Sequence, residues 1–140
     1  MIDNANEWIR LRRSDDSDDN QRAANETVPL AVWMQIHAKA PDLRAFIAYN
    51  RTSPPEVLAM LARDESWIVR HAVAERGDAP ESALRELADD VNESVRILVA
   101  GHPSTQRDVL QYLSRVDSAD AVRVKASARL RTQAHPSSHS

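Results

Sequence analysis

Aspartate and arginine recur in this chain at a fixed spacing, and they are the charged residues best placed to do chemistry. An Asp, four variable residues and a Val-Arg pair occur three times, with starts 26 and then 27 residues apart. Such charges form either a strip that recognises a ligand or a structural set, in which each Asp caps or orients the following helix and each Arg bridges to an Asp of its own or the adjacent repeat. A recognition site is seldom built three times in register, so the repetition favours the structural interpretation. We call these residues the Asp-Arg ladder: Asp64, Arg70, Asp90, Arg96, Asp117 and Arg123.

Arg44 differs from the ladder arginines. It occupies the first arginine position of the repeat, but Ala38 stands at the matching aspartate position. Without an aspartate in its own repeat, Arg44 is expected to be free to meet a partner.

Large apolar side chains interrupt the repeat at two adjacent positions. Trp67 aligns with a proline or an acidic residue in the other repeats, and Ile68 aligns with Asp, Ser or Ala. Exposed aromatic and aliphatic groups are enriched where proteins bind one another, so this pair predicts an exposed contact patch. The alternative is that Trp67 packs over a neighbouring repeat or over a helix of the N-terminal leader. The predicted protein-binding residues are Trp67, Ile68, Tyr49, His71, Arg44 and Arg76.

Residues for catalysis or metal binding form no recognisable motif. The chain has no Cys, which excludes disulfides, thiolate metal sites and a cysteine nucleophile. A glycine-rich phosphate loop, a Gly-x-Ser-x-Gly elbow and a His-Glu-x-x-His motif are all absent from the sequence. We therefore predict no enzymatic activity, no cofactor and no metal.

The ladder belongs to a longer repeat that must position it. Self-similarity at a period of roughly 20–50 residues indicates a stacked repeat architecture. Each repeat predicts two short helices, for example over 67–74 and 80–88, and helices this short need neighbours to be stable. Ser53 and Asp78, each followed three residues later by Glu, predict capping boxes at helix starts. The positions that recur in register are Leu58, Leu84 and Leu110; Leu61, Leu87 and Leu113; and Ala48, Ala74 and Ala100.

Composition favours an all-helical protein with a protein partner. Aromatic residues make up 4% of the 140 residues and Gly only 2 positions, which suits helices packed through aliphatic side chains. Residues 21–120 carry 15 acidic and 11 basic side chains, whereas residues 121–140 carry four basic and no acidic ones. Nucleic-acid binders usually have a net basic domain, so nucleic acid is the less favoured partner.

No apolar segment resembles a signal peptide or a membrane span, so we expect a cytoplasmic protein.

Three segments are expected along the chain. Residues 1–26 lie outside the repeat register and form an acidic leader, either partly disordered or folded as an N-terminal helical cap. Residues 27–131 form the repeat domain. Residues 132–140 are polar and predict a disordered tail.

The repeated phrase Val-Ala…Pro-Glu-x-x-Leu-x-x-Leu-Ala-x-Asp, with Asp-x-x-x-x-Val-Arg at each junction, resembles the HEAT-like repeat superfamily. Its short period is more similar to variant leucine-rich repeats of the LRV type. The resemblance covers residues 29 to about 130 and implies a right-handed α-solenoid of about four two-helix repeats. The founding variant of that class couples its solenoid to a cysteine-ligated iron–sulfur module, which a chain without Cys cannot hold.

The resemblance also implies a class of function. Proteins of this build are mostly non-enzymatic binders, which indicates a protein–protein interaction module. Small stand-alone HEAT-like proteins are similar to some bacterial immunity proteins that neutralise a toxin domain, and an acidic body would suit a basic toxin. The alternative is a nucleic-acid-binding module that uses the Arg ladder and the basic C-terminal segment, which salt-dependent binding to DNA or RNA would reveal.

Overall fold

The computed structural model describes residues 1–134, and this part of the chain contains helices but no strand. The all-helical class that the sequence predicts is confirmed. None of the helices between residues 1 and 134 has the length and apolar composition that a membrane span requires. The elements, in chain order, are α1 (Ala5–Arg13), α2 (Ser17–Asn25), α3 (Leu30–Lys39), a 3-10 turn η1 (Pro41–Leu43), α4 (Arg44–Tyr49), α5 (Pro55–Leu61), α6 (Trp67–Glu75), α7 (Glu81–Leu87), α8 (Glu93–Gly101), α9 (Arg107–Val116) and α10 (Asp120–Ala134).

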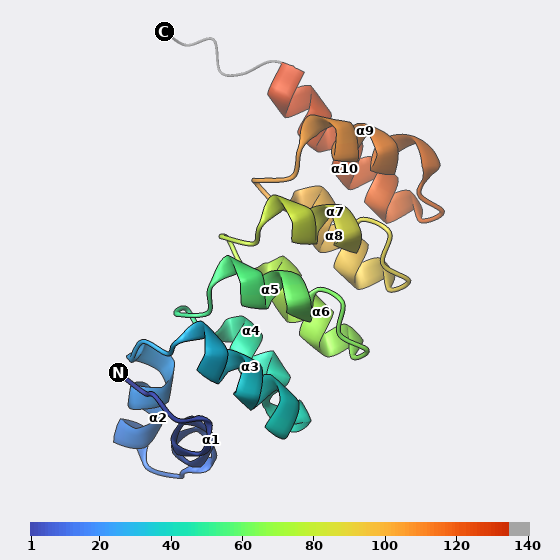
Figure 1. The fold of residues 1–140 in the computed structure, drawn as a ribbon. Coiled ribbons are helices and arrows are strands. Elements are labelled where there is room, and N and C mark those ends of the chain that lie inside the picture. Colours follow the sequence, from blue (N-terminus) through green and yellow to red (C-terminus); the bar gives the residue numbers. More distant parts are fainter. Residues whose placement is uncertain (135–140) are drawn as a thin grey trace, which may run out of the picture.

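From α3 onward the helices alternate between two layers, and successive helix pairs stack in one direction (Figure 1). We call α3, α5, α7 and α9 the odd layer, and α4, α6, α8 and α10 the even layer. Neighbours in the even layer pack against each other more extensively than neighbours in the odd layer. The odd layer is therefore the more splayed of the two.

Aliphatic side chains fill the space between the two layers. The recurring leucines of α5, α7 and α9 are all buried, which explains why Leu repeats at these positions. In the even layer the recurring residues are the small Ala48, Ala74 and Ala100, which are also buried and let the helices approach closely. Burial of each leucine side chain contributes about 1.5–3 kcal/mol, so the repeated leucines contribute substantially to stability.

Residues 1–26 form the helices α1 and α2, and α1 packs on both α2 and α3. The Trp8 ring is buried and meets Trp33 of α3 edge-on, with ring centroids 5.4 Å apart. Asn4 and Asp16 cap α1 and α2, because their side-chain oxygens accept backbone amides of the first turn. The acidic run thus lies at the start of α2, where the helix dipole favours negative charge.

Two local expectations are wrong. Neither α5 nor α7 has a side-chain cap: Ser53 donates its hydroxyl to the Ile47 carbonyl, and the Asp78 carboxylate pairs with Arg76 instead. The helix α10 continues to Ala134, so the first residues of the expected disordered tail are helical. The remainder of that tail, residues 135–140, lies outside the described residues.

Candidate functional site

The Asp-Arg ladder connects successive helix pairs. In each rung, an arginine of one even helix pairs with the aspartate that precedes the next even helix. The aspartate side chains are 4% exposed and the arginine side chains 13–17%. The three pairs, with their N···O distances, are Arg44–Asp64 (3.2 Å), Arg70–Asp90 (2.6 Å) and Arg96–Asp117 (2.9 Å).

The same side chains also bind the backbone, as Asp90 and Arg96 illustrate. The second carboxylate oxygen of Asp90 accepts the Asn92 amide at 2.9 Å, and Arg96 Nη1 donates to the Asp90 carbonyl at 2.8 Å. Corresponding bonds occur at Asp64 and Asp117. The hydrogen-bonding groups of the ladder are therefore engaged inside the protein.

The expectation that Arg44 is free is wrong. Its guanidinium pairs with Asp64, because the rungs run from one repeat to the next and not within a repeat. The alanine at position 38 consequently has no bearing on Arg44. At the other end of the ladder, Arg123 pairs with Asp120 of its own helix and donates to the Asp117 carbonyl.

A second row of contacts joins the helix pairs near the opposite ends of the even helices. In each contact, a side chain donates a hydrogen bond to a backbone carbonyl of the preceding helix pair. Successive donor residues lie 26 or 27 positions apart in the sequence. We call it the carbonyl row. Its bonds are Asn50 Nδ2 to the Ala23 carbonyl (2.7 Å), Arg76 Nη1 to Asn50 (2.6 Å), His102 Nε2 to Arg76 (2.6 Å) and Arg129 Nη1 to His102 (2.9 Å).

The carbonyl row fixes the tautomer of His102. Its Nε2 faces a carbonyl and must donate, while its Nδ1 accepts the Ser104 amide at 3.0 Å. The buried imidazole therefore carries a proton on Nε2 and serves as a structural donor.

Arg76 belongs to the carbonyl row and is removed from the candidate contact surface. Its side chain is 11% exposed, donates to the Ala48 carbonyl as well, and pairs with Asp78 at 2.8 Å. The hydrogen bond from Arg76 holds the pKa of the Asp78 carboxyl below its ordinary value. Like Arg44, Arg76 is engaged in internal contacts.

The other predicted contact residues lie on α4 and α6 of the even layer. Trp67 and Ile68 of α6 are 47% and 53% exposed, and Tyr49 of the adjoining α4 is 51% exposed. His71 lies edge-on to the Trp67 ring at 5.9 Å, and its Nδ1 is 2.9 Å from Glu75 Oε1. Partial burial and then the nearby Glu75 carboxylate raise the pKa of Tyr49.

Phe46 extends this group and was not found from the sequence. It lies on α4 three residues before Tyr49 and is 44% exposed. The Arg12 guanidinium carbon is 4.2 Å from its ring centroid. We call Phe46, Tyr49, Trp67, Ile68 and His71 the even-layer patch.

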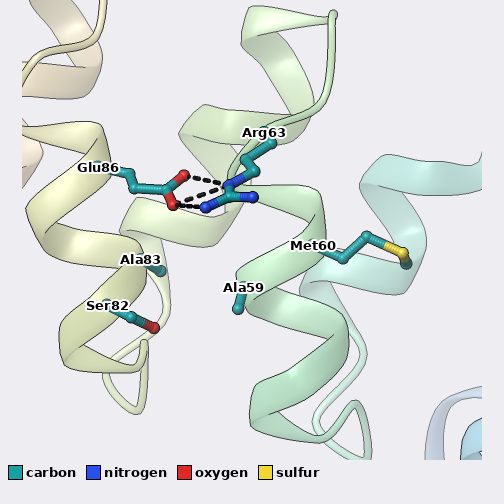
Figure 2. A pocket seen from close by; sticks show the side chains of 6 residues that line it. All are labelled: Ala59, Met60, Arg63, Ser82, Ala83 and Glu86. Atoms are coloured by element: carbon teal, nitrogen blue, oxygen red, sulfur yellow. Dashed lines mark hydrogen bonds and ion pairs between the residues drawn. The ribbon is translucent and has the colours of Figure 1, made fainter.

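The odd layer presents a different surface, with grooves bridged by ion pairs. Figure 2 shows the groove between α5 and α7, about 430 Å³ in volume, where Arg63 and Glu86 pair across it. A similar groove lies between α7 and α9, where Arg85 pairs with Asp108 at 2.8 Å. Exposed pairs of this kind contribute little stability. The grooves recur with the helix spacing, so we attribute them to the splay of the layer.

Within residues 1–134, no group of three or more His, Cys, Asp or Glu side chains could hold a metal ion. No family model, curated protein or solved structure matches this chain. The even-layer patch is consequently identified from its exposure and its contacts alone.

His37 makes the first rung of the ladder sensitive to pH. Its Nε2 is 4.0 Å from Asp64 Oδ1, and burial followed by the charge of Arg44 lowers its pKa below the ordinary value of 6.5. The unfolded chain therefore binds the proton more readily. The contribution of His37 to stability is present above pH 6.5 and is lost as the pH falls through the lowered folded-state pKa.

We expect the variant His37→Gln to lose less free energy of unfolding than the wild type between about pH 7 and about pH 5. Urea denaturation at each pH measures the difference. Between about pH 9 and about pH 7, where His37 is neutral in both states, the two proteins should respond alike. Equal losses in the acidic interval would contradict the prediction.

Proposed function

We propose that this chain is a non-catalytic protein-binding module whose contact surface is the even-layer patch. The observation that carries the proposal is the exposure of Trp67 and Ile68 at positions where other repeats have polar or small residues. Tyr49 and Phe46 are also exposed, on the neighbouring helix α4. Large exposed apolar side chains on adjacent helices are typical of interaction sites.

The architecture that we propose is a right-handed α-solenoid of HEAT-like or variant leucine-rich repeats. The alternating layers and the two rows of inter-repeat contacts support it. Closer packing in the even layer would put that layer on the inner, concave side. Solenoids use their concave surface to bind partners, which is where the even-layer patch would then lie.

We further propose that the partner is a basic protein domain. Glu65 precedes Trp67 by two residues, and Glu93 occupies the position of Trp67 in the next repeat. Both are exposed, and neither has an ion-pair partner within residues 1–134. Acidic groups beside an apolar patch favour a partner of opposite charge. In its most concrete form the proposal describes a cytoplasmic bacterial immunity protein that neutralises a basic toxin domain.

The alternative is a nucleic-acid-binding module, favoured by the basic side chains Lys125 and Arg131 on the exposed surface of α10. That function would also need the ladder arginines, and those of α4, α6 and α8 are paired with buried aspartates. Binding to DNA or RNA that weakens steeply with salt concentration would favour the alternative.

Trp67→Ala tests the proposal. Loss of a central aromatic contact should weaken partner binding about 30-fold, equivalent to about 2 kcal/mol. Tyr112→Ala is the matched control, because Tyr112 is also 47% exposed but lies in the odd layer. Its effect should stay below about threefold.

The partner is captured from the native cell, identified, produced separately and titrated against each variant by calorimetry. A single stoichiometric protein partner with the expected difference supports the proposal. Equal losses for Trp67→Ala and Tyr112→Ala, or the absence of any stoichiometric protein partner, would contradict it.

A further inference from the structure

Arg12 is held in place without a counter-charge. Its guanidinium carbon lies 4.2 Å from the Phe46 ring centroid, and its Nε is buried with no hydrogen-bond partner. Its neighbours on α1 are different, because Arg10 and Arg13 each pair with an aspartate. Within residues 1–134 no carboxylate lies within ion-pair distance of Arg12. An arginine fixed against an aromatic ring keeps its charge and its fork of N–H donors oriented.

The same arginine lines a pocket of about 220 Å³ between α1, α2 and α4. The rings of Phe46 and Tyr49 contribute apolar walls. Asn50 also lines the pocket, but its amide already donates to the Ala23 carbonyl and accepts from Thr52. Arg12 is therefore the charged group that this pocket offers to a ligand.

We infer that the pocket receives the carboxylate of an aspartate or glutamate side chain of the protein partner. The guanidinium fork matches a carboxylate through two parallel hydrogen bonds, and the aromatic walls accept the methylene groups of the incoming side chain. The inference rests on the proposed function. Tyr49 belongs both to the pocket and to the even-layer patch, so a partner that covers the patch also reaches Arg12. A single acidic anchor is compatible with a partner that is basic overall, and it would fix the register of binding.

The test uses the full chain at low ionic strength and two small probes, N-acetylglutamate N-methylamide and the neutral glutamine analogue. Nuclear magnetic resonance follows the Arg12 Nε–H signal and the backbone amides of α4. The glutamate compound should cause saturable shifts, with a dissociation constant on the order of 10–100 mM. The glutamine compound should bind at least about fivefold more weakly, because it lacks the charge.

Two variants locate the response. Arg12→Met should abolish the shifts in α4, and its flexible side chain can still cover Phe46, which preserves the fold. Arg51→Met should leave the shifts unchanged, because Arg51 is an exposed arginine outside the pocket. Equal binding of the two probes, or unchanged binding in Arg12→Met, overturns the carboxylate site.

The source of the carboxylate is tested with the identified partner. Arg12→Met should weaken its binding about tenfold, with Arg12→Lys intermediate because an ammonium group cannot form the paired bonds. Partner binding unchanged in Arg12→Met overturns the assignment of the carboxylate to the partner. If the glutamate probe binds through Arg12 but no protein partner exists, the proposed function and that assignment fail, whereas the pocket itself stands as a carboxylate site.

Discussion

Asp90→Ala is expected to lower the free energy of unfolding by about 3–5 kcal/mol. One Asp90 carboxylate oxygen is 2.6 Å from Arg70 Nε, and the other accepts the Asn92 amide at 2.9 Å. Truncation leaves a mostly buried guanidinium without its counter-charge and removes the acceptor of that amide. Because a domain is stable by about 5–15 kcal/mol in total, the variant should be close to unfolding at physiological temperature.

Asp89→Ala is the matched control for this prediction. Asp89 is the adjacent residue, but it is exposed and its side chain accepts a hydrogen bond only from Tyr112, within the described residues. Its replacement should cost about 1 kcal/mol or less. Denaturation in guanidinium chloride, followed by circular dichroism, measures both variants. A loss for Asp90→Ala no larger than that for Asp89→Ala would show that the rung is not structural.

A double variant separates the charge from the packing. Arg70→Met with Asp90→Asn removes both charges and keeps an acceptor for the Asn92 amide. Since a buried ion pair replaced on both sides is often nearly neutral, stability should return to within about 1–2 kcal/mol of the wild type. Such recovery would attribute the loss in Asp90→Ala to the uncompensated arginine.

The ladder shows how far the sequence predicts contacts in this protein. Its residues could be found because the same residue types recur at a constant interval. The pairing could not be found, because a period gives the positions of Asp64 and Arg70 without telling whether an arginine meets the aspartate of its own repeat or of the next. The prediction that Arg44 is free to meet a partner is wrong for this reason alone.

The carbonyl row could not be predicted at all. Its donors, Asn50, Arg76, His102 and Arg129, share a position and a function but not a residue type. Their acceptors are backbone carbonyls, which every residue possesses and which leave no trace in a sequence. Any side chain with a donor of suitable reach satisfies the requirement, so selection for the contact does not produce a motif.

The even-layer patch was predictable only where a repeat departs from its neighbours. Trp67 and Ile68 replace polar or small residues, and that departure indicated exposure. For Phe46 the repeat indicates burial, because Ala72 stands at the same position of the next repeat and is buried. The difference arises because α6 has even-layer neighbours on both sides, whereas α4 packs extensively on α6 alone within that layer.

Trp8→Ala is expected to destabilise the protein by about 3–5 kcal/mol. The ring is fully buried against Trp33, and its Nε1 donates to the Ala23 carbonyl at 3.0 Å. The same carbonyl accepts Asn50 Nδ2 at 2.7 Å, so it is also the first acceptor of the carbonyl row. Truncation would therefore open a cavity between α1 and α3 and loosen the contact that ties α2 to the end of α4.

Trp67→Ala is the control, because it removes the same side chain from an exposed position and should cost about 1 kcal/mol or less. Trp8→Phe should lie between the two, since it keeps most of the volume and loses the hydrogen bond. Chemical denaturation ranks the three variants. Equal losses for Trp8→Ala and Trp67→Ala would mean that α1 and α2 do not stabilise the stack.

Where along the chain the destabilisation occurs is a sharper test of these two predictions than its magnitude. In a stack of repeats each helix pair is stabilised mainly by its immediate neighbours. Loss of a covering pair should therefore destabilise the adjacent helix pair most. Hydrogen exchange in Trp8→Ala should accelerate most in α1 to α4 and progressively less towards α10. In Asp90→Ala the acceleration should instead centre on α6 to α8. Uniform acceleration along the chain in both variants would show that the helix pairs unfold as a single unit and would contradict nearest-neighbour stabilisation.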